Sequence, residues 1–584
     1  MKECLDFRKK IAEELAEALH AISADESIET ISADEIERVI EIPQEKAMGD
    51  YAFPCFRLAK VFHEPPDKIA ARLAEATGPS DVAERVEAVR AYVNIFLRRD
   101  RMVEETIRTI LTDPSSYGKT NQGNGRTVLV EFSSPNIAKP FHIGHIRSTV
   151  IGNSLYKIYE ALGYRVVRIN HLGDYGTQFG KMIVAYRHWG CEDEVKKDPI
   201  KTLLSYYTKF HVEAEKDPEL EEEAREAFAK LEQGEKAERE LWQWFRRESL
   251  TAFKRVYALM GIEFDSYKGE SFYSDTMSRF EEELRTKGLM KESQGAEVVD
   301  LSSYGLDIAL IKKSDGSSLY MTRDIAAACY RKDTYDFYKN IYVVASQQNL
   351  HFAQLFKILD LMGYIWAKTC VHVPFGMVRL EEGTMSTRHG RVVFLEDVLN
   401  KAIEKTKAII REKNPDAGPV DVIARQVGVG AVMFNELANN RIKDYTFVWD
   451  QVLNFDGETG PYVQYTHARC ASLLRKAGKE SAEKAQEAKN LNTKYVQSDT
   501  AFDLVRLLYA YPAVVAEAGE KYEPSVITRH IIDIAQAFNK FYHDEHILVE
   551  NEEEKTARLA VAAATKAVLK NGLALLGVQA PERM

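Results

Sequence analysis

The chain has 584 residues and a formal net charge of −11, with 45% hydrophobic and 29% charged residues. This composition is typical of a soluble globular protein of roughly two to four domains, and no apolar run of about 18 residues is present that would predict a membrane-spanning helix. The negative charge argues against a protein that coats nucleic acid non-specifically, although it is compatible with a local basic face.

The cysteines and the N-terminus indicate the compartment. Six cysteines are scattered without a C-x-x-C pair. This argues against a zinc ribbon or a disulfide framework and favours a reducing cytoplasm. The first stretch, MKECLDFRKKIAEEL, contains acidic residues and no apolar core, so it predicts an amphipathic helix and not a secretory signal.

Residues 1–118 are predicted to form an N-terminal α+β domain. Helical patterns and a turn at Gly49-Asp50 precede the strand-like run AYVNIFLRR. The stretch SSYGKTNQGNGR that follows is rich in turn formers, so we interpret it as a linker.

A parallel α/β domain is predicted over residues 126–395. The strand VLVEFSS, a helix from Ile146 to Leu162 and the strand RVVRINHL have the spacing of a βαβ unit. DIALIKK, NIYVVAS and CVHVPFGMV are expected to continue the sheet.

Two regions are predicted to be helical. A charged insertion over about residues 185–260 interrupts the α/β domain, and its polar residues are expected to form a solvated face. From Leu395 onward the pattern predicts helices, so residues 396–584 are expected to be all-helical.

The stretch SSPNIAKPFHIGHIRST lies where the first strand of the α/β domain gives way to a helix. Ligands bind at the carboxyl ends of strands in open parallel sheets, where helix N-termini offer free N–H groups. His142 and His145 share one face of the first helical turn, and Gly144 leaves room for a flat ring. Two such imidazoles can bond phosphate oxygens and stabilise charge on phosphorus. From spacing alone, a metal site and a simple helix cap remain alternatives.

A second element, GMVRLEEGTMSTRHGRVVFLEDVL, follows far along the chain. The two elements together resemble class I aminoacyl-tRNA synthetases, which pair an H-I-G-H turn with a mobile K-M-S-K-S loop. The resemblance narrows to the arginyl-tRNA synthetase family. The stretches that carry it are INHLGDYGTQFGKM, YKGESFY, SLYMTRDIAAA, YVVASQQNLHFAQ, GETGPYVQYTHAR and the terminal APERM.

The resemblance implies a Rossmann-type class I catalytic domain with helical insertions, an N-terminal α+β domain and a C-terminal all-α bundle. Its anticodon-binding part would cover about residues 460–584. It implies a ligase that activates L-arginine with ATP to arginyl-adenylate and transfers it to the 3′ end of tRNA(Arg), releasing AMP and diphosphate. ATP would enter as its Mg²⁺ complex, with no tightly bound protein-ligated metal. The expected partners are tRNA(Arg), L-arginine and ATP, without a membrane, for a cytoplasmic monomer.

A pocket for a guanidinium should offer acceptors only, because the group carries five donors and a permanent charge. Glu270 and Asp324 are the carboxylates that we place against it, and such a site would reject lysine by its geometry and neutral amino acids by leaving buried carboxylates unpaired. Together with the family positions, the predicted arginine-binding residues are Asn136, Asp174, Gln178, Glu270, Tyr320, Asp324 and Gln348.

The loop departs from the family pattern. It reads T-M-S-T-R, so both lysines of K-M-S-K-S are absent. The resemblance implies that Lys139 supplies the missing cation, and Arg388 can add part of the charge. The predicted catalytic residues are His142, His145, Lys139 and Arg388, and the predicted ATP-binding residues are His142, Gly144, His145, Met385 and Ser386.

Aromatic and cationic residues predict contacts with RNA. Tyr462, Tyr465 and Arg469 share a helix face on which unpaired bases can stack, with core packing as the alternative. MGDYAFP and YVNIFL resemble the family's added domain, which touches the tRNA elbow. The predicted tRNA-binding residues are Asn94, Phe96, Tyr462, Tyr465, Arg469 and Met584.

Two other functions remain open at this point. One is a nucleotidylyl transferase that acts on a small acid without RNA, against which the terminal domains argue. The other is a silent tRNA-binding paralogue, against which the intact His142, His145, Glu270 and Asp324 argue. The resemblance also implies that ATP–pyrophosphate exchange needs tRNA as well as arginine.

Overall fold

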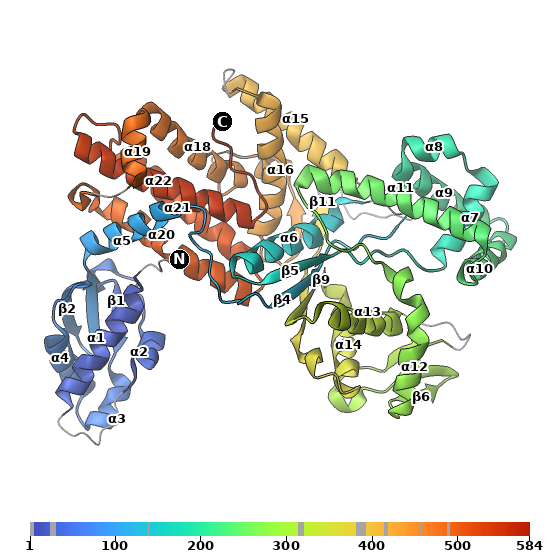
Figure 1. The fold of residues 1–584 in the computed structure, drawn as a ribbon, viewed down its shortest axis with the longest axis horizontal. Coiled ribbons are helices and arrows are strands. Elements are labelled where there is room, and N and C mark those ends of the chain that lie inside the picture. The colour runs from blue at the N-terminus through green and yellow to red at the C-terminus, as the bar shows by residue number, and fades with distance from the viewer. Residues whose placement is uncertain are drawn as a thin grey trace. The chain divides into compact units, whose positions relative to one another are not determined.

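The computed structural model describes residues 5–23, 31–137, 139, 141–313, 320–380, 393–413, 418–455, 457–487 and 491–584. These form two compact units (Figure 1). The first contains residues Met1–Tyr117, Arg469–Ala510 and Gln536–Val568, and the second contains Gly118–Ala468, Tyr511–Ala535 and Leu569–Met584. Over the described ranges, no helix combines the length and the apolar character that crossing a membrane requires.

The first unit opens with a small α+β domain, whose antiparallel sheet has the order β1-β3-β2. Phe7, Ile11, Leu15 and Leu19 recur every four residues and are fully buried, so the predicted amphipathic helix is confirmed. The elements are α1 (Phe7–Ile22), α2 (Ala33–Val39), β1 (Tyr51–Pro54), α3 (Ala59–Phe62), α4 (Pro66–Thr77), β2 (Ala83–Val89), β3 (Tyr92–Leu97) and α5 (Arg99–Thr112).

Helices complete both units. The chain crosses between the units inside four of them, so their residues belong partly to each. The helices of this region are α18 (Gly460–Lys476), α19 (Lys479–Glu487), α20 (Asp499–Glu520), α21 (Ser525–Asp544) and α22 (Glu552–Leu575).

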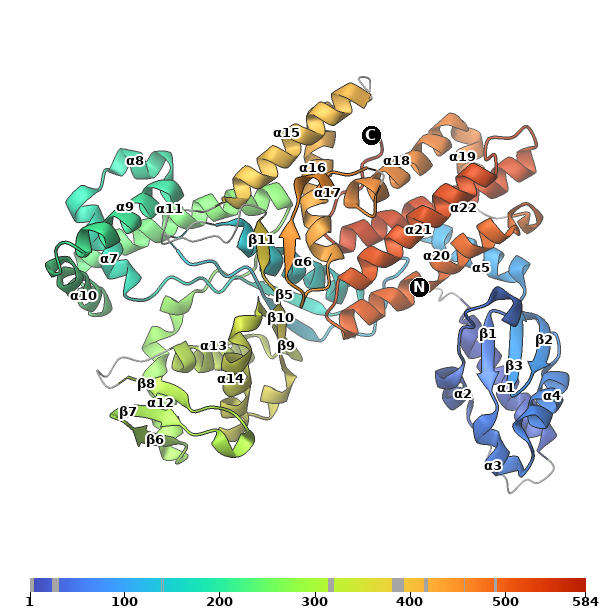
Figure 2. The ribbon, with the colours of Figure 1, turned by 180° about the vertical axis from the view of Figure 1, so that it is seen from behind.

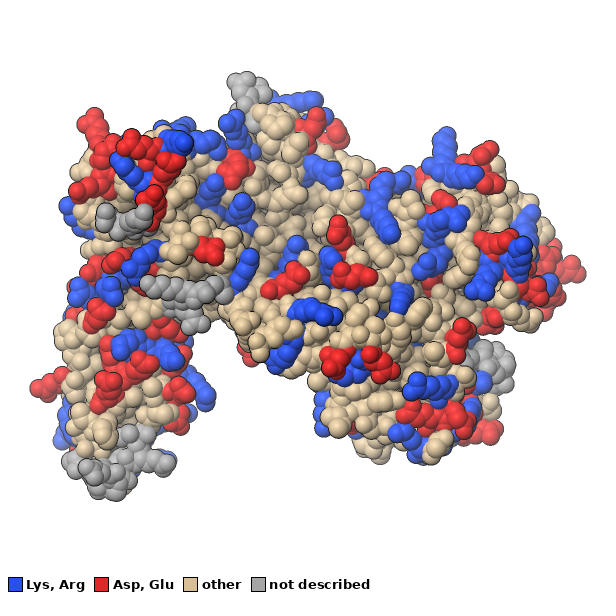
Figure 3. All heavy atoms as spheres, in the orientation of Figure 1, with Lys and Arg blue, Asp and Glu red and all other residues tan. Residues whose placement is uncertain are grey.

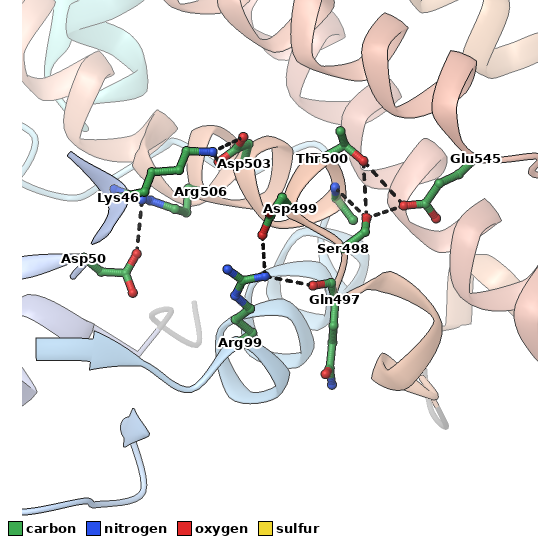
Figure 4. A network of polar contacts seen from close by, with 11 residues as sticks. Lys46, Asp50, Arg99, Gln497, Ser498, Asp499, Thr500, Asp503, Arg506 and Glu545 are labelled. Carbon is green, nitrogen blue, oxygen red and sulfur yellow. Dashed lines mark hydrogen bonds and ion pairs between the residues drawn. The ribbon is translucent and has the colours of Figure 1, made fainter. Parts of the chain in front are cut away.

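A line of ion pairs joins the N-terminal α+β domain to α20 within the first unit (Figure 4). Asp499, Asp503 and Arg506 lie at positions i, i+4 and i+7 of the helix and therefore form one stripe. Their partners, in the same order, are Arg99 at 2.8 Å, Lys46 at 2.6 Å and Asp50 at 3.1 Å. Exposed pairs contribute little to stability individually. Because the three residues of α20 lie on one stripe, the ion pairs define how the N-terminal domain is aligned along this helix.

A four-stranded parallel sheet of order β10-β9-β4-β5 organises the second unit (Figure 2). Its strands are β4 (Thr127–Glu131), β5 (Arg165–Ile169), β9 (Lys339–Ala345) and β10 (Cys370–Phe375). The predicted βαβ unit is confirmed, since α6 (Ile146–Ala161) connects β4 to the parallel β5. The β9–β10 crossover, through α14 (Asn349–Leu361), extends the sheet on the other side of β4. The order therefore reverses between β4 and β9, where open sheets bind ligands.

One strand prediction was wrong, and another is confirmed only in part, since Cys370–Phe375 of CVHVPFGMV forms β10 of the main sheet. DIALIKK forms β8 (Ala309–Lys312), which belongs to a separate antiparallel sheet with β6 (Met290–Ser293) and β7 (Ala296–Val299). In β8 buried and exposed side chains alternate, as in a sheet with one solvated face, whereas Ile341–Val343 of β9 are buried in succession. The end of CVHVPFGMV leaves the main sheet: β11 (Val378–Leu380) pairs with β12 (Tyr445–Phe447), a strand inside the region predicted to be helical.

The helical insertion begins earlier than predicted, directly after the turn that follows β5. It contains α7 (Gln178–Trp189), α8 (Glu192–Lys197), α9 (Pro199–Ala214), α10 (Glu219–Glu232) and α11 (Lys236–Met260). Positive and negative side chains are interspersed on the face of the molecule in Figure 3. The remaining helices are α12 (Met277–Thr286), α13 (Tyr320–Tyr335), α15 (Leu395–Lys413), α16 (Val420–Ala438) and α17 (Trp449–Val452).

Candidate active site

The two histidines of the H-I-G-H turn lie at the carboxyl end of β4, where the short helix η3 (Ile143–His145) leads into α6. The backbone N–H of Gly144 donates to Nδ1 of His142 at 3.0 Å, and that of His142 donates to Nδ1 of His145 at 3.2 Å. The ring centroids are 4.0 Å apart. The imidazoles thus cap the turn that carries them and still form one cluster.

Both imidazoles are neutral near pH 7. Burial lowers the pKa of His142 to about 4 and that of His145 to about 3, with the neighbouring His142 and Lys139 also lowering the latter. Because Nδ1 of His142 accepts a hydrogen bond, the ring hydrogen must lie on Nε2. His142 therefore offers a neutral donor to a phosphate oxygen. The positive charge of Lys139 acts on this turn, so it can complement the neutral rings.

The described residues give no support to the metal alternative for this turn. Across the described ranges, no group of three or more His, Cys, Asp or Glu side chains is arranged to hold a metal ion.

Residues 381–392, with the predicted Met385, Ser386 and Arg388, lie outside the described residues. The segment that follows them is bonded to the His turn. The N–H of Ile143 donates to the carbonyl of Val393 at 3.1 Å, and that of Leu395 donates to the carbonyl of Phe141 at 3.0 Å. The chain therefore leaves this loop directly beside His142, as a joint action on ATP would require.

A strained turn leads from β4 to Asn136. Ser133 and Ser134 both have positive φ, 69° and 45°, which non-glycine residues rarely adopt. Buried hydrogen bonds hold the turn: Ser133 donates its N–H to Oγ of Ser148 at 2.9 Å, and its hydroxyl lies 2.8 Å from that of Tyr257. Strain of this kind is typical of functional sites.

The exposed Asn136 lies against Gly173, which follows β5. The N–H of Ile137 donates to the Gly173 carbonyl at 3.0 Å, and the N–H of Gly173 donates to the Pro135 carbonyl at 3.1 Å. A Cβ at Gly173 would lie 1.9 Å from Oδ1 of Asn136, so this close approach requires glycine. The contact joins the carboxyl ends of β4 and β5.

Asp174 is fully buried and uses both carboxylate oxygens on its own chain. Oδ2 accepts from Nε of Arg246 at 2.8 Å, and Oδ1 accepts from the backbone N–H of Ser271 at 2.9 Å. Ser271 belongs to the short helix η4 (Glu270–Thr276), so Asp174 fixes the turn that carries Glu270. These bonds indicate a positioning role for Asp174, and its contact with arginine stays a prediction.

Glu270 and Asp324 lie within electrostatic reach of each other. Burial raises the pKa of Glu270 to about 7; Arg323 opposes this shift, and the charge of Asp324 adds to it. Partial burial and the charge of Glu270 raise the pKa of Tyr320, with a further contribution from Asp324. Glu270, Tyr320 and Asp324 are therefore electrostatically coupled, with the two carboxylates mostly buried and Tyr320 exposed.

The structure adds two cations that the sequence analysis missed. Nη1 of Arg323 lies 3.6 Å from Oε2 of Glu270, and Nε2 of His351 lies 2.6 Å from Oδ2 of Asp324. His351 stands in the first turn of α14, where a parallel strand gives way to a helix. His145 has the same position at the start of α6. A histidine at a strand-to-helix transition is therefore the pattern from which His351 could have been predicted.

A buried ion pair underlies the site. Oε2 of Glu131, the last residue of β4, lies 2.5 Å from Nη2 of Arg331 on α13. Nη2 of Arg331 is also 3.4 Å from Nδ1 of His171. Burial opposes the charge on Arg331, but Glu131 outweighs this and raises the pKa of the guanidinium. The pair ties α13, and with it Asp324, to the central strand.

The two predicted glutamines lie at the sheet's carboxyl edge. Gln178 is the first residue of α7 and is half-buried, and Gln348 ends the short helix η6 (Ser346–Gln348) and is exposed. Among the described residues, no hydrogen bond or ion pair joins either side chain to Glu270 or Asp324. Their place at the edge is compatible with contact to a ligand.

The predicted RNA contacts in the N-terminal domain differ in exposure. Asn94 is buried, and its amide donates to the sulfur of Met48 at 3.8 Å, which does not fit the predicted RNA contact. Phe96, on the same strand, is half-buried, with the guanidinium of Arg85 3.7 Å from its ring centroid. The ring and the cation together form a surface on which a base or phosphate could bind.

The predicted contacts in the helical region also divide. Arg469 donates to the Asn539 side chain and lies 5.1 Å from the ring centroid of Tyr542, so α18 and α21 bring an aromatic ring and a cation together. Tyr465, one turn before Arg469, is exposed and Tyr462 is half-buried. Met584 packs against an apolar cluster formed by α15 and α16, which favours a structural role over the predicted RNA contact.

Comparisons with known proteins give a consistent result. A family model described as "tRNA synthetases class I (R), catalytic domain" matches residues 106–449. The "Arginyl tRNA synthetase N terminal domain" matches residues 8–97, and the "DALR anticodon binding domain" matches residues 463–584.

Full-length relatives extend these matches. The chain is 58% identical to the arginine–tRNA ligase of Clostridioides difficile strain 630, over 96% of this chain and 98% of the relative. It is 53% identical to that of Halothermothrix orenii, over 99% and 100%. Its fold is similar to the Thermus thermophilus arginyl-tRNA synthetase, with a TM-score of 0.79 and 26% identity over 99% of this chain and 100% of that one.

Proposed function

Because the chain belongs to the arginyl-tRNA synthetase family of class I enzymes, and so joins arginine to tRNA with ATP as a substrate, we propose that Glu270, Tyr320 and Asp324 bind the substrate guanidinium. The observation that carries this proposal is the contact between η4 and α13: Glu270 lies 3.6 Å from Arg323, the neighbour of Asp324, and Tyr320 precedes Asp324 by one turn. The two carboxylates are mostly buried and Tyr320 is exposed, and together they offer acceptors to a planar cation with five donors.

The first step would be attack of the arginine carboxylate on the α-phosphate of ATP, which enters as its magnesium complex. Asn136, on the strained turn, is placed to hold the backbone end of arginine. The Nε2–H of His142 and the ammonium of Lys139 would bond the phosphates as charge shifts onto the leaving diphosphate. Met385, Ser386 and Arg388 would close over the same phosphates.

In the second step, the terminal ribose hydroxyl of tRNA(Arg) attacks the carbonyl of the adenylate and releases AMP. No protein nucleophile is required, because positioning and charge stabilisation supply the rate. Phe96 with Arg85, and Tyr465 with Arg469, are the surfaces we propose for the RNA. We further propose that the protein is a monomer. We also propose that it works in a reducing compartment, because the five described cysteines are free.

Aminoacylation assays with arginine, lysine and citrulline test the arginine pocket. Glu270→Gln and Asp324→Asn should each raise the arginine KM by about 10- to 100-fold, because each removes a charge-assisted bond worth about 1.5–3 kcal/mol. Citrulline, which is neutral, should compete poorly. ATP consumption that depends on both arginine and tRNA excludes a nucleotidylyl transferase and a silent paralogue. A crystal structure with arginine bound away from both carboxylates would overturn the assignment.

A further inference from the structure

His351 contacts the carboxylate of Asp324 from a second helix. It lies in the first turn of α14, while Asp324 lies in the second turn of α13. Nε2 of His351 is 2.6 Å from Oδ2, and the two side chains keep only 23% and 28% of their exposure. The bond uses one carboxylate oxygen and leaves Oδ1 for another partner.

Each partner of the pair favours the charged form of the other. Burial opposes the charge on His351, but the hydrogen bond and the charge of Asp324 outweigh it and raise the pKa of the imidazole. Burial likewise opposes the charge on Asp324, and the same hydrogen bond outweighs it and lowers the pKa of the carboxyl. The other titratable or charged groups around the pair are His171, Glu270, Tyr320, Arg331, Tyr342 and His372.

A substrate guanidinium changes this balance. It would bring a second positive charge to a carboxylate that already has an imidazolium as its counter-ion, and like charges lower the pKa of the group that can lose a proton. Arginine cannot lose its proton, whereas His351 can. A neutral His351 would still donate Nε2–H to Oδ2, so the hydrogen bond survives the loss of the charge.

We propose that His351 is a positioning residue for arginine: it holds Asp324 through Nε2–H and gives up its Nδ1 proton to solvent when the substrate guanidinium becomes the counter-ion. The proposal rests on the proposed arginine pocket. It makes arginine affinity depend on pH. Between the lowered pKa of His351 with arginine bound and its raised pKa without arginine, affinity increases up to about tenfold per pH unit, for one proton released.

The test is calorimetric titration of the full chain with arginine from about pH 6 to about pH 8.5, in two buffers with different ionisation heats. The difference between the buffers gives the number of protons released. The informative variant is His351→Gln, whose side-chain amide keeps a donor but cannot carry a charge. His372→Gln is the matched control, because His372 is a nearby half-buried histidine that bonds the Val344 carbonyl and not Asp324.

The expected result separates charge from structure. His351→Gln should release fewer protons than the wild type. At the high-pH end of the titration, where the affinity of the wild type stops increasing, it should bind arginine within about threefold of the wild type. His351→Ala should bind more weakly at every pH, and His372→Gln should match the wild type. The protons that the His351→Gln variant still releases on arginine binding come from Glu270. Adding Glu270→Gln should abolish this remaining release.

Two outcomes would contradict different claims. Equal proton release by the wild type and His351→Gln overturns the role of His351. Unchanged arginine affinity in Asp324→Asn overturns the arginine pocket itself, because removal of the counter-ion carboxylate then has no effect on the substrate.

Discussion

The guanidinium of Arg323 lies 3.6 Å from the carboxylate of Glu270, inside the cluster that we propose to recognise the guanidinium of the substrate. Both side chains are largely buried, so the low exposure strengthens the contact. Burial raises the pKa of Glu270 to about 7, and Arg323 is the main influence that holds it down. Arg323 therefore keeps part of the Glu270 population ionised at neutral pH, in the form that a cation needs.

Arg323→Ala should raise the arginine KM near pH 7. Removing the positive charge raises the pKa of Glu270, and a one-unit increase reduces its ionised fraction at that pH about fivefold. The KM should therefore fall as pH rises, with its midpoint displaced upward from about 7. Arg323→Lys, which keeps the charge, is the control. Identical KM–pH profiles for Arg323→Ala and the wild type would show that Arg323 does not act on Glu270.

Asp174→Asn should weaken arginine binding without direct contact to it. The neutral side chain loses the charge-assisted bond from Arg246 and its hold on the turn of Glu270. We expect the KM for arginine to rise about tenfold while kcat at saturating arginine changes less. Asp265→Asn is the matched control, because Asp265 pairs with Arg168 on β5, away from η4. A larger effect on kcat than on KM would contradict this positioning role.

The sequence predicts the parts of this site that depend on local pattern. The central strands are recognisable because they are apolar on both faces. The His turn is recognisable because a strand, three proline or glycine residues (Pro135, Pro140 and Gly144) and a helix follow one another. DIALIKK is also apolar, but which sheet it joins depends on long-range pairing that its own residues do not encode. The alternating burial of side chains along β8 is what distinguishes its antiparallel sheet from the parallel one.

Partners of buried charges are harder to predict. Asp174 was predicted to bind arginine because its position in the chain fits, but nothing in LGDYG reveals that Arg246, on the inserted helix α11, neutralises it. Arg323 and His351 were missed for the same reason: each acts on a carboxylate supplied by another element. The sequence shows which residues are charged, but which counter-ion each of them meets depends on the fold.

His142→Ala should slow adenylate formation by about 10²–10³, the usual effect of removing one preorganised donor, and leave arginine binding nearly intact. Because burial lowers the pKa of His142 to about 4, the ring stays neutral from pH 6 to 8. Its protonation therefore predicts no loss of activity until pH falls toward about 4. Pyrophosphate exchange measured against pH checks both statements. Full activity in His142→Ala and His145→Ala would mean that the turn is only a helix cap.

Lys139→Ala should damage adenylate formation more than Met385→Leu does. The rings of the His turn are neutral, so the transition state needs a cation, and the charge of Lys139 already acts on His145. Met385 is expected mainly to pack the loop. Single-turnover rates of the two variants provide the comparison. Equal small effects would leave Arg388 as the cation, and Arg388→Ala would then show the larger loss.

ATP–pyrophosphate exchange should require tRNA as well as arginine, and the second unit contains a route for this coupling. β11, which leads into residues 381–392, pairs with β12, and the N–H of Gly376 donates to the Arg441 carbonyl at 2.8 Å. Arg147 on α6, the helix of the His turn, donates to the Lys443 carbonyl at 2.6 Å.

β11, which precedes residues 381–392 in the chain, and α6, which follows the His turn, are therefore both bonded to residues 440–447. These residues continue through α17 into α18 with Tyr462 and Tyr465. RNA bound on α18 can shift this segment between two states and so favour the closed arrangement of a loop that lacks its usual lysines. Exchange should be slow without tRNA and restored by tRNA(Arg), including one whose 3′ end cannot be charged, because the coupling needs binding and not transfer. Arg147→Lys keeps the charge but lacks the forked donors of the guanidinium. This variant should therefore weaken the stimulation by tRNA. Rapid exchange in the absence of any tRNA would refute the coupling and leave the arginine pocket untouched.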